Sequence, residues 1–178
     1  MEINMNYSGI KNCDVANGPG VRVSLFVSGC THHCKGCFNA ETWDFNFGEE
    51  FTDEHADQII EYLKPSYIKG FSLLGGEPFE PCNQRVLVSF LKRIKETYPE
   101  KTIWCYTGYL LDDELLSESR ARCEVTDEML SYIDILVDGE FKQELKDLRL
   151  RFRGSSNQRI IDLKETLSGG EIVWWKEL

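Results

Sequence analysis

The sequence has no long apolar run and comparatively little positive charge. No stretch approaches the roughly 18 consecutive apolar residues that a membrane-spanning helix needs. Residues 1–10 lack a basic segment followed by an apolar one, so we expect no secretory leader. The 20 basic residues are outnumbered by 30 acidic ones, which gives a formal net charge of −10. This charge opposes binding to nucleic acid or to an anionic membrane. From the lack of a leader pattern and of a membrane-spanning run we expect a cytoplasmic protein.

Internal repeats, low-complexity tracts and linkers rich in proline, glycine or serine are also lacking. A chain of 178 residues is too short for two ordinary domains, so residues 1–178 are predicted to form one. Only three histidines are present, and they form no evident catalytic triad. The seven cysteines cannot all pair, and a reducing compartment disfavours disulfides, so their role is expected in metal chemistry.

Strand patterns alternate with helical patterns along the first three quarters of the chain. The predicted strands are 22–27, 68–74, 101–106 and 133–137, and the predicted helices are 52–64, 83–98 and 112–133, the last interrupted near Cys123. This alternation indicates an α/β fold with mostly parallel strands and right-handed crossovers. Because a closed barrel of eight units usually needs about 200 to 250 residues, we expect an open, partial βα barrel. After residue 139 the pattern weakens.

A glycine follows each predicted strand, at Gly29, Gly75, Gly108 and Gly139. The carboxyl ends of parallel strands meet at one edge of a sheet, and open sheets build their ligand sites there. We therefore expect the functional site to lie at this edge.

Three closely spaced cysteines follow the first predicted strand. Cys30, Cys34 and Cys37 have the spacing C-x3-C-x2-C, and soft thiolates gathered in this way select iron-sulfur clusters, zinc or copper(I). A four-iron cluster normally takes four protein thiolates, so three would leave one iron open for another ligand. The alternative is a structural zinc site completed by His32, His33 or a distant cysteine.

The sequence Gly75-Gly76-Glu77-Pro78 follows the next predicted strand. Glycines let the backbone approach a ligand closely, and free carbonyl and carboxylate oxygens accept hydrogen bonds from an ammonium or amine group. Alone, this tetrad is more often a turn than a site. Its position one strand after the cysteines makes the joint pattern informative.

These two motifs together, with Phe38 directly after the last cysteine, resemble the signature of radical S-adenosylmethionine enzymes. The resemblance implies that Cys30, Cys34 and Cys37 hold one 4Fe-4S cluster. It also implies that the amino and carboxylate groups of S-adenosylmethionine chelate the open iron, that Gly75 to Pro78 bind the methionine amino group, and that Phe38 lies near the adenine.

A narrower resemblance extends over nearly the whole chain. The segments 17–20, 25–30, 37–43, 103–109, 136–139 and 153–158 are similar to the family of activating proteins of anaerobic ribonucleoside-triphosphate reductases. It implies an enzyme that cleaves S-adenosylmethionine reductively to methionine and 5'-deoxyadenosine and installs a glycyl radical on the large reductase subunit. It further suggests an electron donor such as flavodoxin, and a position of Asn17 to Gly20 near the cluster.

Other readings remain open at this point. An activating enzyme of another glycyl radical enzyme, or a small radical S-adenosylmethionine synthase, would share the two general motifs. A zinc-binding interaction module would need no S-adenosylmethionine. In the favoured reading, no catalytic residue is required beyond the cluster and S-adenosylmethionine, because the cofactors supply the chemistry and the protein orients them.

Several further residues are candidates for contact with the cofactors. Backbone N–H groups around Gly36 can reach cluster sulfurs; Thr107 or Tyr106 can touch S-adenosylmethionine, and Asp138 can accept from its ribose. The expected cofactor-binding residues are therefore Gly36, Cys37, Phe38, Gly75, Gly76, Glu77, Pro78, Thr107 and Asp138. The structural alternatives are a plain turn at Gly36, core packing of the strand residues and a turn at Asp138-Gly139.

The remaining histidines, cysteines and arginines are given structural or docking roles. His32 and His33 are expected to be exposed loop residues. The cysteines outside the motif are expected to be buried apolar side chains: Cys13, Cys82, Cys105 and Cys123. The basic residues Arg149, Arg151, Arg153 and Arg159 either form a solvated face or help to dock the reductase.

Overall fold

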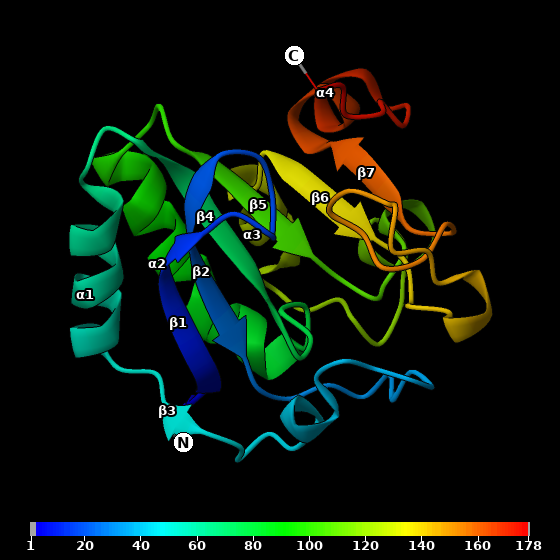
Figure 1. Ribbon diagram of the computed structural model, residues 1–178, viewed down its shortest axis with the longest axis horizontal. Coiled ribbons are helices and arrows are strands. Elements are labelled where there is room, and N and C mark those ends of the chain that lie inside the picture. The colour runs from blue at the N-terminus through cyan, green and yellow to red at the C-terminus, as the bar shows by residue number, and fades with distance from the viewer. Residues whose placement is uncertain (1–2, 178) are drawn as a thin grey trace.

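The computed structural model describes residues 3–177 and contains a seven-stranded mixed sheet with the strand order β3-β1-β2-β4-β5-β6-β7 (Figure 1). The strands are β1 (Asn6–Asp14), β2 (Val21–Val27), β3 (Glu49–Glu50), β4 (Ile68–Gly75), β5 (Thr102–Tyr106), β6 (Ile135–Asp138) and β7 (Arg159–Asp162). The α-helices are α1 (Asp53–Leu63), α2 (Pro81–Thr97), α3 (Thr126–Tyr132) and α4 (Leu163–Gly169). Shorter helical turns are η1 (Ala40–Trp43), η2 (Leu111–Leu115) and η3 (Gln143–Leu145).

The four central strands are those that the sequence predicts. β2, β4, β5 and β6 are neighbours and run parallel, whereas β1, β3 and β7 are joined to them by antiparallel pairing. The α/β class is therefore confirmed, with a mixed sheet. The antiparallel strands β1, β3 and β7 at the two sides of the sheet were not predicted, because a strand half exposed to water does not need a continuous apolar pattern.

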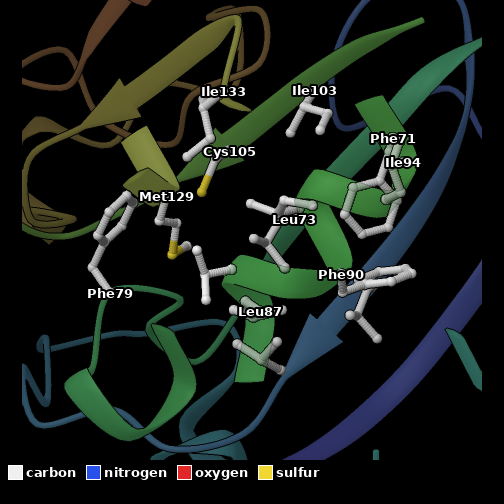
Figure 2. Packing of buried hydrophobic residues seen from close by; sticks show 14 of the residues in the cluster. Phe71, Leu73, Phe79, Leu87, Phe90, Ile94, Ile103, Cys105, Met129 and Ile133 are labelled. Atoms are coloured by element: carbon white, nitrogen blue, oxygen red, sulfur yellow. The ribbon is translucent and has the colours of Figure 1, made fainter. Parts of the chain in front are cut away.

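Alternate residues of the central strands pack against the helices. Figure 2 shows Phe71 and Leu73 of β4 and Cys105 of β5 in contact with side chains from α2 and α3. Apolar residues of α2 lie at helical spacing on the stripe that meets the sheet, namely Leu87, Phe90, Leu91 and Ile94. This core fixes the strand ends that carry the functional site.

The opposite face of the sheet carries polar and aromatic side chains. Trp104, Ile135 and Val137 form a second buried cluster there, and the ring of Trp175 packs edge-on against Trp104 with centroids 5.1 Å apart. Arg22 is also buried, and its guanidinium donates to the Ser72 hydroxyl at 2.8 Å and to backbone carbonyl oxygens. Hydrogen bonds to the backbone thus satisfy this charge without a carboxylate partner.

The segment 17–20 crosses the face of the sheet that carries Trp104, where an added Cβ at Gly18 would lie 3.2 Å from the Trp104 ring. It precedes the first residue of β2, whereas Cys30 follows the last, and β2 runs for seven residues between them. The Ser72 hydroxyl donates to the carbonyl oxygen of Asn17 at 2.5 Å, and Arg22 donates to the carbonyl oxygen of Pro19. Because Ser72 pairs with Ser24 and Trp104 in the middle of the sheet, the segment packs there, and its position near the cluster stays a prediction.

The predicted helix over 112–133 is largely wrong. Only η2 and α3 are helical within it, and the chain between them is irregular. The hydroxyls of Ser117 and Ser119 bond to backbone carbonyls, and the Gln84 amide donates to the carbonyl of Ala121 at 2.6 Å. Side chains that bond to the backbone compete with helical hydrogen bonds, which explains the interruption.

The last strand and helix, β7 and α4, form where the hydrophobic pattern of the sequence is weak, but local capping signals mark the helix. Asp162 caps α4 by accepting from the N–H of Glu165 at 3.1 Å, and Gly170 ends the helix with a left-handed φ of 75°. Among residues 3–177, no helix combines the length and the apolar composition that spanning a bilayer requires.

Candidate active site

An open pocket of about 200 Å³ lies at the carboxyl ends of the parallel strands. The loop between β2 and β3 runs past these ends (Figure 1) and supplies one wall. The ends of β4, β5 and β6 supply the opposite wall. The lining residues are Cys30, His32, Cys34, Cys37, Phe38, Asn39, Trp43, Leu74, Gly75, Gly76, Glu77, Tyr106, Thr107, Gly108, Gly139, Phe141, Gly154 and Gln158.

The cysteine loop is held in place by its own backbone. The Gly29 N–H donates to the carbonyl oxygen of Thr42 at 2.7 Å, so η1 folds back onto the start of the loop. The Cys37 N–H donates to the carbonyl oxygen of Cys34 at 3.1 Å, and Gly36 completes this turn with a φ of 75°. The local folding thus brings all three cysteines to one wall of the pocket.

The three thiols provide a donor set that fits a cluster with three protein ligands. Burial raises the pKa of Cys30 to about 12, so this thiol needs a bound metal in order to ionise at neutral pH. The Asn39 N–H donates to Sγ of Cys37 at 3.4 Å, the kind of contact that tunes an iron-sulfur cluster. Over residues 3–177, no three His, Cys, Asp or Glu side chains converge around a single ion. Thiolates that bind different irons of one cube need not converge in this way.

Residues 75–77 are locked against the cysteine loop by backbone hydrogen bonds. The Gly76 N–H donates to the carbonyl oxygen of Val27 at 2.7 Å, and the Glu77 N–H donates to that of Gly29 at 2.8 Å. Gly75 has a φ of 111°, and a Cβ there would lie 2.5 Å from backbone atoms of Val27. The carbonyl oxygen of Gly76 accepts no hydrogen bond from residues 3–177. This segment therefore brings an unused backbone acceptor to the pocket.

The carboxylate of Glu77 is committed to the protein itself. Its side chain is 1% exposed and accepts from the N–H of Phe79 at 2.8 Å, the N–H of Gly108 at 2.7 Å and the hydroxyl of Thr107. The carboxylate thus already accepts from three protein donors, and its contact with the cofactor stays a prediction. Glu77 joins the ends of β4 and β5, and Thr107 presents its hydroxyl to Glu77.

His32 is not an exposed loop residue, contrary to expectation. Its side chain is 4% exposed and lies between two carboxylates, 2.8 Å from Oε1 of Glu77 and 3.0 Å from Oε1 of Glu140. Burial alone would lower the pKa of His32, but the hydrogen bonds and charges of the two carboxylates outweigh it, so that the pKa is raised. His33 is exposed, and its ring stacks on Trp43 at 4.4 Å.

Three other candidate residues do not line the pocket. Gly36 belongs to the turn of the cysteine loop, and Pro78 follows Glu77 away from the lining residues. Asp138 is 0% exposed, and its oxygens accept from Nε of Arg159 at 2.8 Å and from the N–H of Leu111 at 2.8 Å. The structure thus places Asp138 in a buried ion pair, and its contact with the ribose stays a prediction.

Phe38 lies at the mouth of the pocket. Its ring is 65% exposed, 5.4 Å from the ring of Phe141, and Nζ of Lys146 lies 4.8 Å above it. An exposed aromatic at a pocket mouth offers a surface on which a flat ligand ring can stack.

Comparison with known proteins identifies the family. A family model described as a 4Fe-4S single cluster domain matches residues 16–161. The anaerobic ribonucleoside-triphosphate reductase-activating protein of Haemophilus influenzae is 49% identical over 158 residues, covering 88% of this chain and 97% of the relative. The proteins of the same name from Escherichia coli K12 and Enterobacteria phage T4 are 45% and 40% identical, covering 90% and 88% of this chain and 100% and 93% of the relatives. The chain belongs to the anaerobic ribonucleoside-triphosphate reductase-activating protein family.

Membership of this activating-protein family confirms the predicted cofactors, a 4Fe-4S cluster and S-adenosylmethionine. The matched domain includes both the cysteine loop and residues 75–78. Around the pocket, sequence reasoning missed His32 and the residues that follow β6, notably Phe141 and Gly154. The similarity of segment 153–158 to this family was the available signal for the latter.

The remaining four cysteines lie outside the pocket, and all seven cysteines are unpaired thiols. Cys105 is fully buried in the core, as expected, and Cys82 and Cys123 are half-buried. Cys13 is exposed, which contradicts the expectation of a buried apolar side chain.

Proposed function

We propose that this chain generates a glycyl radical on the large subunit of the anaerobic ribonucleoside-triphosphate reductase of its own organism. The observation that carries the proposal is the placement of Cys30, Cys34 and Cys37 in one pocket with the backbone of Gly75 and Gly76. The family relationship supports the choice of reductase, because the relatives are named for activating it.

Within this proposal the three thiolates hold the cluster and leave one iron to S-adenosylmethionine. When bound, the cluster supplies the electron for cleavage of S-adenosylmethionine to methionine and 5'-deoxyadenosine, the latter formed with the hydrogen removed from the reductase glycine. The backbone of Gly75 and Gly76 takes the methionine amino group, since the carbonyl of Gly76 is free to accept. Phe38, Tyr106 and Thr107 form the wall beside the adenosine.

The shape of the chain suits a macromolecular substrate. In this proposal the four parallel strands belong to an open, partial βα barrel, which is consistent with their order in the sheet, and the pocket at their ends opens to the surface. A protein loop that carries the target glycine can enter from this side and exclude water from the reaction. We further propose a cytoplasmic location and a small reductant protein, such as flavodoxin, as electron donor.

The proposal predicts a radical signal that depends on every component. Anaerobic incubation of the cluster-loaded protein with reductant, S-adenosylmethionine and the cognate reductase should give a glycyl radical doublet in electron paramagnetic resonance. A reductase variant with the target glycine replaced by alanine should give none. Cleavage of S-adenosylmethionine without any doublet on the intact reductase would mean that another protein is the substrate.

A further inference from the structure

We propose that His32 is a positioning residue that ties the cysteine loop to the ends of β4 and β6 and so holds the pocket in the shape that binds S-adenosylmethionine. The inference rests on the proposed function, because it assigns S-adenosylmethionine to this pocket. His32 lies between Cys30 and Cys34 in the sequence, and the radical chemistry itself does not use it.

The imidazole of His32 connects three separate segments. Its Nε2 lies 2.8 Å from Oε1 of Glu77, directly after Gly76, and its Nδ1 lies 3.0 Å from Oε1 of Glu140, shortly after β6. Both partners are carboxylate oxygens, and hydrogen bonds to charged groups are the stronger class in proteins. One side chain of the loop thus bonds to the ends of two strands.

Packing fixes the plane of the imidazole ring, whose two nitrogens are already held by hydrogen bonds. The ring lies edge-on to that of Tyr109 with centroids 4.4 Å apart. It also lies directly over Gly108, where an added Cβ would come within 2.7 Å of the imidazole. The Gly108 N–H donates to the same Glu77 oxygen that His32 contacts. The ring therefore has one position, and the loop is held by it.

The start of the loop is held by the Glu77 N–H, which donates to the carbonyl oxygen of Gly29 at 2.8 Å, and by the Thr31 hydroxyl, which donates to Glu80 at 2.7 Å. Over residues 32–37, His32 is the residue whose side chain hydrogen-bonds to carboxylates at the strand ends. Glu77 keeps its bonds from Thr107, Gly108 and Phe79 when His32 is changed, so the strand ends stay in place. Loss of His32 should therefore loosen the wall that carries the cysteines relative to the wall formed by Gly75 and Gly76.

The matched variants are His32→Asn and His33→Asn in the anaerobically reconstituted protein. Asparagine at position 32 is too short to reach both carboxylates, whereas at position 33 it suits the left-handed φ of 52° and removes only the stacking on Trp43. The readouts are iron content, the dissociation constant for S-adenosylmethionine in the absence of reductase, and the change in the signal of the reduced cluster when S-adenosylmethionine is added.

We expect His32→Asn to retain the iron content of the wild type and to raise the dissociation constant about tenfold, the effect of one lost charged hydrogen bond. The signal change should then appear only at correspondingly higher concentrations. The dissociation constant of His32→Gln, which keeps one donor, should lie between those of the wild type and His32→Asn. That of His33→Asn should match the wild type. A dissociation constant within twofold of the wild type, or a proportional loss of iron, overturns the proposal.

If His32→Asn does not fold, Glu140→Gln tests the same connection from its other end. The Glu140 carboxylate is 52% exposed, so its replacement does not threaten the core. We expect a rise of about threefold in the dissociation constant, and no rise contradicts the proposal. Wild-type protein that binds S-adenosylmethionine but forms no glycyl radical would refute the reductase assignment and leave the role of His32 standing.

Discussion

Replacement of Cys34 by alanine should abolish both the cluster and the cleavage of S-adenosylmethionine. In the proposed ligand set each of the three thiolates holds a different iron, and the pocket offers no fourth cysteine to take the place of Cys34. We expect iron and sulfide contents near zero after anaerobic reconstitution and no methionine released in the presence of reductant. Chemical analysis and chromatography of the products provide the measurement.

The matched control is Cys105→Ala. Cys105 belongs to β5 and is fully buried in the core, in contact with apolar side chains (Figure 2) and outside the pocket. Its replacement removes one small buried group and costs on the order of 1 kcal/mol of stability, with iron content and cleavage close to those of the wild type. Cleavage retained by Cys34→Ala, or lost together with the cluster in a folded Cys105→Ala protein, would contradict the assigned ligand set.

Replacement of Arg159 by methionine should lower the free energy of unfolding by about 3 to 5 kcal/mol. The guanidinium of Arg159 lies within hydrogen-bond distance of both oxygens of Asp138, whose side chain is 0% exposed, and also pairs with Asp112. Without Arg159 a buried carboxylate remains with only the N–H of Leu111 as donor. Urea denaturation of the anaerobic protein measures the change.

Two further variants separate this effect from a general loss of charge. Arg93→Met breaks the exposed pair with Asp57 and should cost no more than about 1 kcal/mol. Adding Asp138→Asn to Arg159→Met removes the stranded charge, so the double variant should be more stable than Arg159→Met alone. Equal losses in Arg159→Met and Arg93→Met would show that the buried pair is not what holds β6 and β7 together.

The central part of the fold could be predicted from the sequence because its strands are buried on both faces. Apolar runs such as those of β2 and β4 leave few alternatives to a parallel sheet. The edges could not be predicted in this way. β1 carries mainly polar residues, and the pairing that makes it a strand comes from β2 and β3.

The site was predictable where its residues lie close together in the sequence. The spacing of Cys30, Cys34 and Cys37 and the tetrad from Gly75 to Pro78 identify two walls of the pocket. The contacts between those walls were not predictable, because they join residues far apart in the chain. His32 meets Glu140 across 108 positions, and no local pattern specifies such a pair.

The burial of two acidic residues assigned to the cofactors was not predictable from the sequence. Glu77 and Asp138 both follow strands, where a free carboxylate would suit a ligand. Each is instead enclosed by donors from the protein, namely Thr107 and Gly108 for Glu77 and Arg159 for Asp138. Only the three-dimensional arrangement shows that these protein donors hydrogen-bond to the two carboxylates.

The most direct test is metal and sulfide analysis of the wild-type protein after anaerobic reconstitution, combined with Mössbauer spectroscopy before and after addition of S-adenosylmethionine. We expect about four irons and four sulfides per chain, with one iron site whose spectrum changes when S-adenosylmethionine binds. One zinc per chain without sulfide, or a full cluster in which all irons are unaffected by S-adenosylmethionine, would contradict an open iron held by Cys30, Cys34 and Cys37.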